Sequence, residues 1–289
     1  MRADGCVIFI HLPKTGGRTL AAALRYKYPS RTLFLDSLHE PLERIEEVPS
    51  ERRRAARAIT GHLHYGVHRH MPQRCDYITM LRDPVARVVS MYRFIRGNPK
   101  NWLHDEVLGS GMGLEEFVLR APDPTAENLQ TRLLSGLGPG KVMALGADGR
   151  LRAPDQPPPP VTEDDLARAK RNLDRFLVIG LTERFDESFI LIRRALGWRL
   201  PMYERQNVSR AERPEPPTPE ALELIRERNR FDLAHYEHAA KRFADAVESQ
   251  GPSFRREVAA FRVLNRVPNA IGPRIPARWR HQVRAILPR

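Results

Sequence analysis

The sequence predicts an α/β fold in which helices flank both faces of a central parallel sheet. Two observations lead to this prediction: short runs rich in apolar and β-branched residues recur along the chain, and helical patterns separate most of them. The strand-like runs are residues 7–11, 32–35, 58–61, 77–81 and 176–181. Because such a sheet binds ligands beyond the carboxyl ends of its strands, the residues that follow these runs are the candidates for a site.

The composition fits a globular protein with a full core. The 289 residues are 41% hydrophobic and 29% charged. The longest apolar runs are far shorter than the about 18 residues that a membrane span requires, and the first of them is too short for a signal peptide. We therefore expect no transmembrane segment and a cytoplasmic location. Two cysteines, Cys6 and Cys75, are too few for a disulfide framework and predict two small buried thiols.

The positive charge is concentrated at the C-terminus. Residues 251–289 hold nine arginines and one acid, so they supply +8 of the net charge of +13. An excess of this size indicates an anionic partner, but it leaves nucleic acid, membrane surface, anionic glycan and phosphorylated cofactor all open. We expect a main domain over residues 1–250 and a basic C-terminal tail over residues 251–289 that contacts an anionic surface. The few apolar anchors of that tail are Trp279, Val283, Ile286 and Leu287.

The helix after the fourth strand-like run is well marked. Asp83 suits its N-cap and Pro84 suits its first turn. Apolar residues then repeat at helical spacing, and we expect their stripe to face the sheet. The stripe consists of Val85, Val88, Val89 and Tyr92.

Two further patterns organise the second half of the chain. Proline-rich segments at 154–160 and 214–219 predict surface connections, because proline is excluded from helix interiors and central strands. A helical pattern then runs from residue 219 to about residue 249. Its packing residues are Leu222, Ile225, Phe231 and Phe243.

The turn after the first strand-like run predicts a cradle for an anion. Residues 7–20 read VIFIHLPKTGGRTL, a strand that leads through a Lys-Thr-Gly-Gly turn into a helix. Gly16 and Gly17 let backbone amides approach a phosphate, Lys14 supplies a full charge, and Thr15 and Thr19 supply hydroxyl donors. The turn is not a Walker A loop, since its lysine precedes the glycines.

A second anion site is predicted after the fourth strand-like run. Residues 77–92 read YITMLRDPVARVVSMY. Arg82 lies at the carboxyl end of its strand, and Ser90 lies on the polar side of the following helix. If the strands are parallel, both sites share one edge of the sheet, where an arginine fork and a hydroxyl can hold a second phosphate.

These two segments resemble the donor-binding elements of sulfotransferases that use 3′-phosphoadenosine 5′-phosphosulfate (PAPS). The similarity is to the Golgi heparan sulfate 2-O- and 6-O-sulfotransferases, related carbohydrate sulfotransferases and their bacterial relatives. PKTGG resembles the family's 5′-phosphosulfate loop, and RDPVARVVSMY resembles its 3′-phosphate element. Further similar stretches are GH at 61–62, NLQTRLLSG at 128–136 and IGLTERFDES at 179–188. Arg18 departs from the pattern, which usually has threonine or serine there.

The resemblance implies a P-loop-NTPase-like sheet and a defined set of site residues. It implies that the enzyme moves a sulfuryl group from PAPS to a hydroxyl of a carbohydrate acceptor by in-line displacement, releases 3′-phosphoadenosine 5′-phosphate (PAP), and needs no metal. Lys14 would act at the leaving phosphate oxygen, where fixed donors stabilise the developing charge. Arg82 and Ser90 would bind the 3′-phosphate. The 5′-phosphosulfate would be bound by Lys14, Thr15, Gly16, Gly17, Arg18 and Thr19.

The acceptor hydroxyl also requires a base, for which histidine is the natural choice because it titrates near neutrality. The resemblance implies His62, while His64 and His11 stay open as alternatives, with His11 more suited to orienting the donor loop. A zinc site among the histidines at 62–70 is not favoured, since no carboxylate or cysteine lies among them.

One helical face is a weaker candidate for substrate contact. Asn128, Thr131 and Arg132 lie together if residues 128–136 are helical, and we expect them, with His64, to contact substrate. A solvated face would fit the same pattern.

Two other function classes also stay open: a phosphoryl transferase, which would need a magnesium carboxylate, and a non-enzymatic basic protein that binds anions through its tail. Nucleic acid is not an expected partner.

Overall fold

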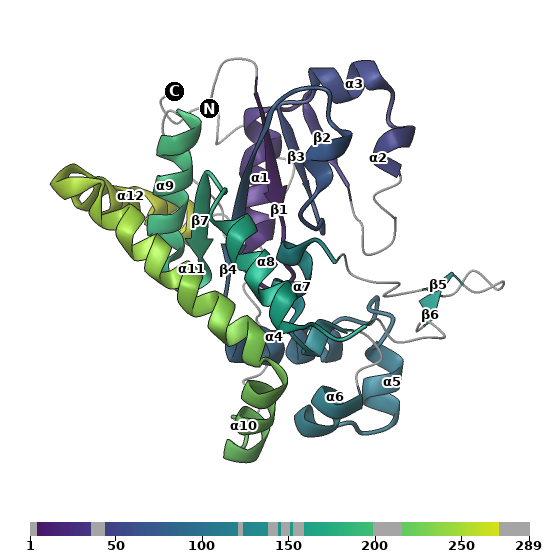
Figure 1. Ribbon diagram of the computed structural model, residues 1–289. Coiled ribbons are helices and arrows are strands. Elements are labelled where there is room, and N and C mark those ends of the chain that lie inside the picture. The colour runs from purple at the N-terminus through teal and green to yellow at the C-terminus, as the bar shows by residue number, and fades with distance from the viewer. Residues whose placement is uncertain are drawn as a thin grey trace.

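The computed structural model of the chain describes residues 5–35, 44–120, 124–137, 144–145, 151–152, 159–198 and 216–271. Five strands form one parallel sheet in the order β2-β3-β1-β4-β7, and helices flank it (Figure 1). The predicted α/β fold is confirmed, and each of its strands lies within two residues of the predicted run. The strands are β1 (Cys6–Ile10), β2 (Thr32–Phe34), β3 (Ala58–Gly61), β4 (Cys75–Leu81) and β7 (Val178–Leu181), and a separate antiparallel pair is formed by β5 (Ala144–Leu145) and β6 (Leu151–Arg152).

The described helices lie mostly between β4 and β7 or after β7. Among the described residues they are α1 (Gly17–Lys27), α2 (Arg44–Glu47), α3 (Ser50–Ala55), α4 (Pro84–Arg96), α5 (His104–Gly109), α6 (Leu114–Arg120), α7 (Leu129–Ser135), α8 (Glu163–Leu173), α9 (Phe185–Leu196), α10 (Pro219–Arg228), α11 (Arg230–Glu248) and α12 (Gly251–Ile271). Short 3-10 turns are η1 (Val67–His70), η2 (Pro124–Ala126) and η3 (Thr182–Arg184).

The position of β1 in the centre of the sheet follows from its composition. All five residues of β1 are apolar and fully buried, as a strand covered on both faces requires. In the parallel register, Ile10 lies opposite Gly61 of β3 and opposite Thr79 of β4. The carboxyl ends of the strands therefore meet at one edge. The residues that follow β1, β3, β4 and β7 at that edge are His11, His62, Arg82 and Thr182.

The predicted start of α4 is confirmed, but the expected partner of its apolar stripe is wrong. The Asp83 carboxylate accepts a hydrogen bond from the amide of Ala86 at 2.8 Å, and Pro84 opens the helix. Val88, Val89 and Tyr92 do not pack on the sheet. They join a second core in which α5, α6 and α10 cover α4. Helical spacing predicts which side of a helix is apolar, but any apolar partner can bury that side.

The helical pattern from residue 219 to residue 249 is divided into α10 and α11. The break is at Asn229, which is fully buried. Its side-chain amide donates to the carbonyls of Ala126 and Ile225, while its side-chain oxygen accepts from the amide of Asn128. Asparagine competes for backbone hydrogen bonds in this way, and it ends α10 where the periodic pattern predicted one continuous helix.

Residues 251–271, which the charge pattern assigns to a basic tail, form α12 and pack on α9. Phe254, Val258 and Phe261 are buried in the main core. Glu257 forms ion pairs with Arg193 and Arg194 of α9. The anchors expected at 279–287 lie outside the described residues, as do residues 154–158 and 214–215 of the proline-rich segments.

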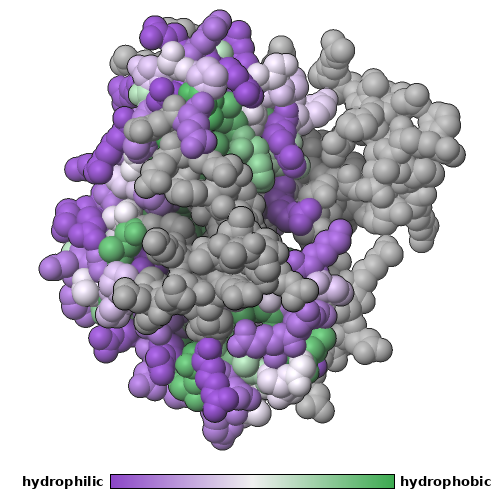
Figure 2. Space-filling view, turned by 90° about the vertical axis from the view of Figure 1, so that its right-hand side faces the viewer, coloured by the Kyte–Doolittle hydropathy of each residue, from purple (hydrophilic) through white to green (hydrophobic). Residues whose placement is uncertain are grey.

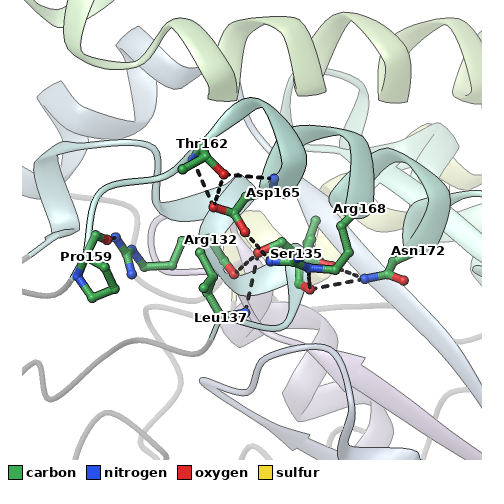
Figure 3. A network of polar contacts seen from close by, with 9 residues as sticks. Arg132, Ser135, Leu137, Pro159, Thr162, Asp165, Arg168 and Asn172 are labelled. Atoms are coloured by element: carbon green, nitrogen blue, oxygen red, sulfur yellow. Dashed lines mark hydrogen bonds and ion pairs between the residues drawn. The ribbon is translucent and has the colours of Figure 1, made fainter.

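A polar network fixes α7 against α8 (Figure 3). Thr162 and Asp165 form a capping box at the start of α8. Arg168 forms an ion pair with Asp165 and donates from Nε to the carbonyl of Ser135 at 3.0 Å. Asn172 also donates to that carbonyl. The carbonyl groups at the end of α7 are thus satisfied by side chains of α8.

On the face that Figure 2 shows, the described surface is mainly hydrophilic, as expected of a chain with 29% charged residues. In Figure 2, apolar residues occur in small, separate patches. Within the described ranges, no helix combines the length and the apolar character needed to cross a membrane.

Gly61→Ala should destabilise the protein by about 1 to 3 kcal/mol, since the added methyl group overpacks a site bounded by backbone. The added Cβ would lie 1.3 Å from the backbone oxygen of Leu35, at the end of β2. Gly109→Ala in α5 is a matched control, because its Cβ would meet nothing within 4 Å. Urea unfolding of both variants measures the difference. Equal midpoints would contradict the close approach of β2 to β3.

Candidate active site

The turn after β1 has the backbone of a compact cradle. Lys14 and Gly16 have positive φ angles of 67° and 75°, so the chain reverses within three residues before α1 begins. The Thr15 hydroxyl donates to the carbonyl of Leu12 at 2.8 Å and closes the turn. A Cβ on Gly17 would lie 2.0 Å from Cδ2 of His11. Only glycine therefore lets the start of α1 lie against that ring, which leaves its first amides at the edge of the sheet.

The two predicted anion sites are brought together. Nη1 of Arg82 donates to the carbonyl of Lys14 at 3.1 Å, across 68 residues of sequence. Thr182, at the end of β7, also holds this turn: its hydroxyl lies 2.8 Å from the carbonyl oxygen of Thr15 and 2.9 Å from that of Leu81. The turn that follows β1 is thus held by residues that follow its neighbours in the sheet, β4 and β7.

Arg82 is held by a glutamine of α7. Oε1 of Gln130 accepts from the amide of Arg82 at 3.0 Å, and Nε2 of Gln130 donates to the carbonyl of Arg82 at 2.9 Å. The backbone amide of Gln130 in turn donates to the Asp232 carboxylate of α11 at 3.1 Å. Paired bonds in both directions fix the backbone from which the guanidinium extends.

The position of Ser90 follows from its neighbour on α4. Nζ of Lys14 lies 4.1 Å from the centroid of the Phe94 ring, a cation–π contact. Ser90 precedes Phe94 by four residues, so both occupy one face of the helix. Ser90 is half-buried. The helix face that carries Ser90 is therefore the one turned toward Lys14.

The turn after β1 and the end of β4 concentrate positive charge although the charged side chains are partly buried. Burial, followed by repulsion from Arg82 and Arg18, lowers the pKa of Lys14 to about 8. Burial also lowers the pKa of Arg82, with a further contribution from Arg93, while Glu183 and Asp83 oppose the shift. A shift in this direction means that the cluster favours a bound anion. The residues therefore fit a phosphate- or sulfate-bearing group.

Two stacked histidines lie beside this turn. The amide of His11 donates to the carbonyl of Gly61, and the ring centroids of His11 and His62 are 4.6 Å apart. Nδ1 of His62 lies 2.9 Å from the carbonyl oxygen of His11. Because a carbonyl can only accept, Nδ1 carries the proton, and the neutral ring has its lone pair on Nε2. Burial, followed by the closeness of the second imidazole, which disfavours a positive charge on His11, holds the pKa of His11 well below its usual range.

The other histidines of this segment bind different partners. Nδ1 of His64 lies 2.8 Å from the carbonyl oxygen of Tyr65, and Nδ1 of His68 lies 2.8 Å from the Tyr77 hydroxyl. In the part of the chain that the structure describes, no three histidine, cysteine or acidic residues are grouped to hold a metal ion.

Asn128 and Thr131 are buried at a joint between α7 and α11. Oδ1 of Asn128 accepts from the amides of Phe231 and Asp232, and the amide of Thr131 donates to the Asp232 carboxylate at 2.7 Å. These contacts give both residues a structural role. A contact between this face and substrate stays a prediction.

Arg132, the third residue of that face, is also buried. Its guanidinium donates to the carbonyl of Pro159 (Figure 3). Substrate contact by Arg132 likewise stays a prediction.

Four residues of the site were not singled out from the sequence. Gln130 and Thr182 lie in two of the stretches that are similar to the sulfotransferase family. Their spacing alone does not indicate that Gln130 holds Arg82 or that Thr182 holds the turn after β1. Phe94 and Arg93 follow Ser90 by four and three residues. Their place on the Ser90 face was a usable signal, since residues at this spacing share one side of a helix.

Comparisons with known proteins match this chain to sulfotransferases. The sequence model of a family described as galactose-3-O-sulfotransferase matches residues 19–271. The chain is 26% identical to heparan-sulfate 6-O-sulfotransferase 2 of Danio rerio, over 92% of this chain and 64% of that protein. It is 24% identical to uronyl 2-sulfotransferase of Mus musculus, over 82% and 62%. It is 30% identical to galactosylceramide sulfotransferase of Homo sapiens, over 68% and 44%. The chain thus spans less than two thirds of the length of each of these relatives.

Proposed function

Since the chain belongs to the galactose-3-O-sulfotransferase family, we propose that it transfers a sulfuryl group from PAPS to a hydroxyl group of a carbohydrate. The relatives it resembles are named for heparan sulfate, uronyl groups and galactosylceramide, which all contain sugars. This membership favours sulfuryl transfer over the phosphoryl transferase and the non-enzymatic anion-binding protein.

The observation that carries the proposal is the convergence of Lys14 and Arg82. Their contact places two cationic side chains from separate strands at one edge of the sheet. In our proposal the turn from Lys14 to Thr19 binds the 5′-phosphosulfate, while Arg82 and Ser90 bind the 3′-phosphate. Positive charge at both the turn and Arg82 suits a nucleotide that carries phosphates at two positions.

The proposed chemistry divides between Lys14 and His62. Nε2 of His62 takes the proton of the acceptor hydroxyl as the oxygen attacks sulfur in line with the leaving phosphate. Nζ of Lys14 stabilises the charge that develops on the leaving oxygen, at a site where burial strengthens the interaction. Buried and neutral, His11 holds His62 through its carbonyl oxygen and its stacked ring.

The test compares two nucleotides that differ only in the 3′-phosphate. In the presence of EDTA, wild-type protein should bind PAP more tightly than adenosine 5′-monophosphate. Arg82→Ala should weaken PAP binding by roughly 10- to 150-fold, the effect of losing a charge-assisted hydrogen bond. Binding of the monophosphate should weaken much less, through the lost bond to the carbonyl of Lys14 alone. Calorimetric titration measures all four affinities.

Arg120→Ala is the matched control, since this exposed arginine lies on α6 and pairs with Glu116. Its PAP affinity should equal that of wild type. Equal losses for both nucleotides in Arg82→Ala would remove Arg82 from its proposed role. Binding of ATP with Mg²⁺ but not of PAP would favour a phosphoryl transferase. Transfer of labelled sulfate from PAPS to a panel of glycans then identifies the acceptor.

A further inference from the structure

The two cysteines of the chain form a pair across the sheet. Cys6 at the start of β1 lies directly opposite Cys75 at the start of β4. Side chains at directly opposite positions of neighbouring parallel strands point to the same face of the sheet. Both cysteines are free: the Cys6 thiol donates to the carbonyl of Val7, and the Cys75 thiol donates to the carbonyl of Gln73. The sequence predicts two small buried thiols, whereas the structure leaves Cys75 half-buried and places the two cysteines directly opposite one another.

We propose that Cys6 and Cys75 are a redox-sensitive modification site, at which a peroxide joins β1 to β4 through a disulfide bond. Neighbouring strands lie about 4.8 Å apart, within the range of about 4.4 to 6.8 Å between the Cα atoms of disulfide-bonded cysteines. The register therefore places the two Cα atoms within the range of a disulfide bond, and a small approach of the side chains completes it. This proposal is independent of the sulfuryl transfer proposed above.

The two thiols differ in a way that sets the order of the steps. Cys75 is half-buried, whereas Cys6 is fully buried. The neighbouring Cys6 lowers the pKa of Cys75, while the neighbouring Cys75 and burial raise the pKa of Cys6. The more acidic and more exposed thiol is the one that a small oxidant meets first. Cys75 is therefore the attacking group and Cys6 the resolving group.

The chemistry balances with hydrogen peroxide as the oxidant. The Cys75 sulfur attacks one peroxide oxygen, so that an S–O bond forms, the O–O bond breaks and one water molecule leaves. The Cys6 sulfur then attacks the sulfur of the resulting sulfenic acid, so that the S–S bond forms, the S–O bond breaks and a second water molecule leaves. Two thiols are oxidised and one peroxide is reduced.

The bond would join the two strands that carry the proposed donor site. At their other ends, β1 leads to Lys14 and β4 leads to Arg82. A bond across the starts of both strands closes a long loop of the chain and restricts the unfolded state, so the oxidised protein should melt at a higher temperature. We expect a rise of roughly 4 °C or more, which dithiothreitol reverses.

The experiment treats the full chain with hydrogen peroxide at neutral pH and then adds catalase. Wild-type protein should lose both thiols in a denatured thiol assay, lose the mass of two hydrogen atoms, and yield one peptide pair that joins Cys6 to Cys75. Cys75→Ser, which leaves the resolving thiol buried, should retain its remaining thiol through the same treatment. Cys6→Ser should accumulate higher oxides at Cys75, because nothing resolves the sulfenic acid.

If Cys6→Ser fails to fold, Cys6→Ala keeps this arm of the test, since alanine leaves no polar group in the core. Retention of both thiols in treated wild type would overturn the proposal. So would a disulfide between two chains, or oxygen gain at Cys75 in place of the peptide pair.

Discussion

His62→Ala should lower turnover by roughly 10²- to 10⁴-fold, the usual contribution of a positioned base, while PAP affinity stays nearly unchanged. The reason is that Nε2 of His62 acts on the acceptor hydroxyl and contacts no donor phosphate in the proposed arrangement. Steady-state transfer assays and calorimetric titration with PAP separate these two quantities.

His62→Asn and His64→Ala are the controls for this loss. Asparagine keeps an N–H group for the carbonyl of His11 but provides no base, so its turnover should be as low as that of His62→Ala. His64 is hydrogen-bonded to the carbonyl of Tyr65, and its removal should matter much less. Near-normal turnover in His62→Ala, with a collapse in His64→Ala or His11→Ala, would move the base to that residue.

Lys14→Ala should lower turnover by roughly 10²- to 10³-fold, the range found when one donor to a developing oxyanion is removed. Affinity for the donor PAPS should fall less, since its bridging oxygen carries less charge before the bond to sulfur breaks. The pKa of Lys14, lowered by burial and by Arg82 and Arg18 to about 8, also sets a pH dependence. Below that pKa the ammonium is charged and attracts the donor. Affinity for PAP should therefore decrease as pH rises through this range.

Arg82→Ala provides the test of that pH assignment. Without repulsion from Arg82, the pKa of Lys14 rises, so the remaining PAP affinity should decline at a higher pH than in wild type. Lys100→Ala, an exposed lysine after α4, should match wild type in both turnover and pH profile. An unchanged alkaline decline in Lys14→Ala would assign the titration to another group.

Local patterns were sufficient to predict the sheet. β1 and β4 are short apolar runs, and each is followed at once by a charged turn and a helix, which favours a parallel arrangement with crossovers. The predicted family is confirmed as well. Pairing of β1 with both β3 and β4 fixes which strand ends are neighbours, and no local pattern contains that order.

The part of the site that depends on long-range contacts could not be predicted. Asn128 and Thr131 have the spacing of a polar helix face, but the partner that buries them, Asp232, lies about one hundred residues later. A helical period shows which residues share a side and not what covers it. The same limit explains the stripe of α4, which packs against other helices and not against the sheet.

The support of Arg82 also has a consequence for dividing the chain. Arg82 is held by Gln130, and Gln130 is held by Asp232 of α11, although all five strands of the parallel sheet end by residue 181. A fragment that stops after α9 would keep each of those strands but lose the carboxylate at the end of this relay. Anyone who shortens the chain to a minimal nucleotide-binding unit must therefore retain the helices beyond residue 216, and homologues can exchange their C-terminal segments only if the acceptor for Gln130 is exchanged with them.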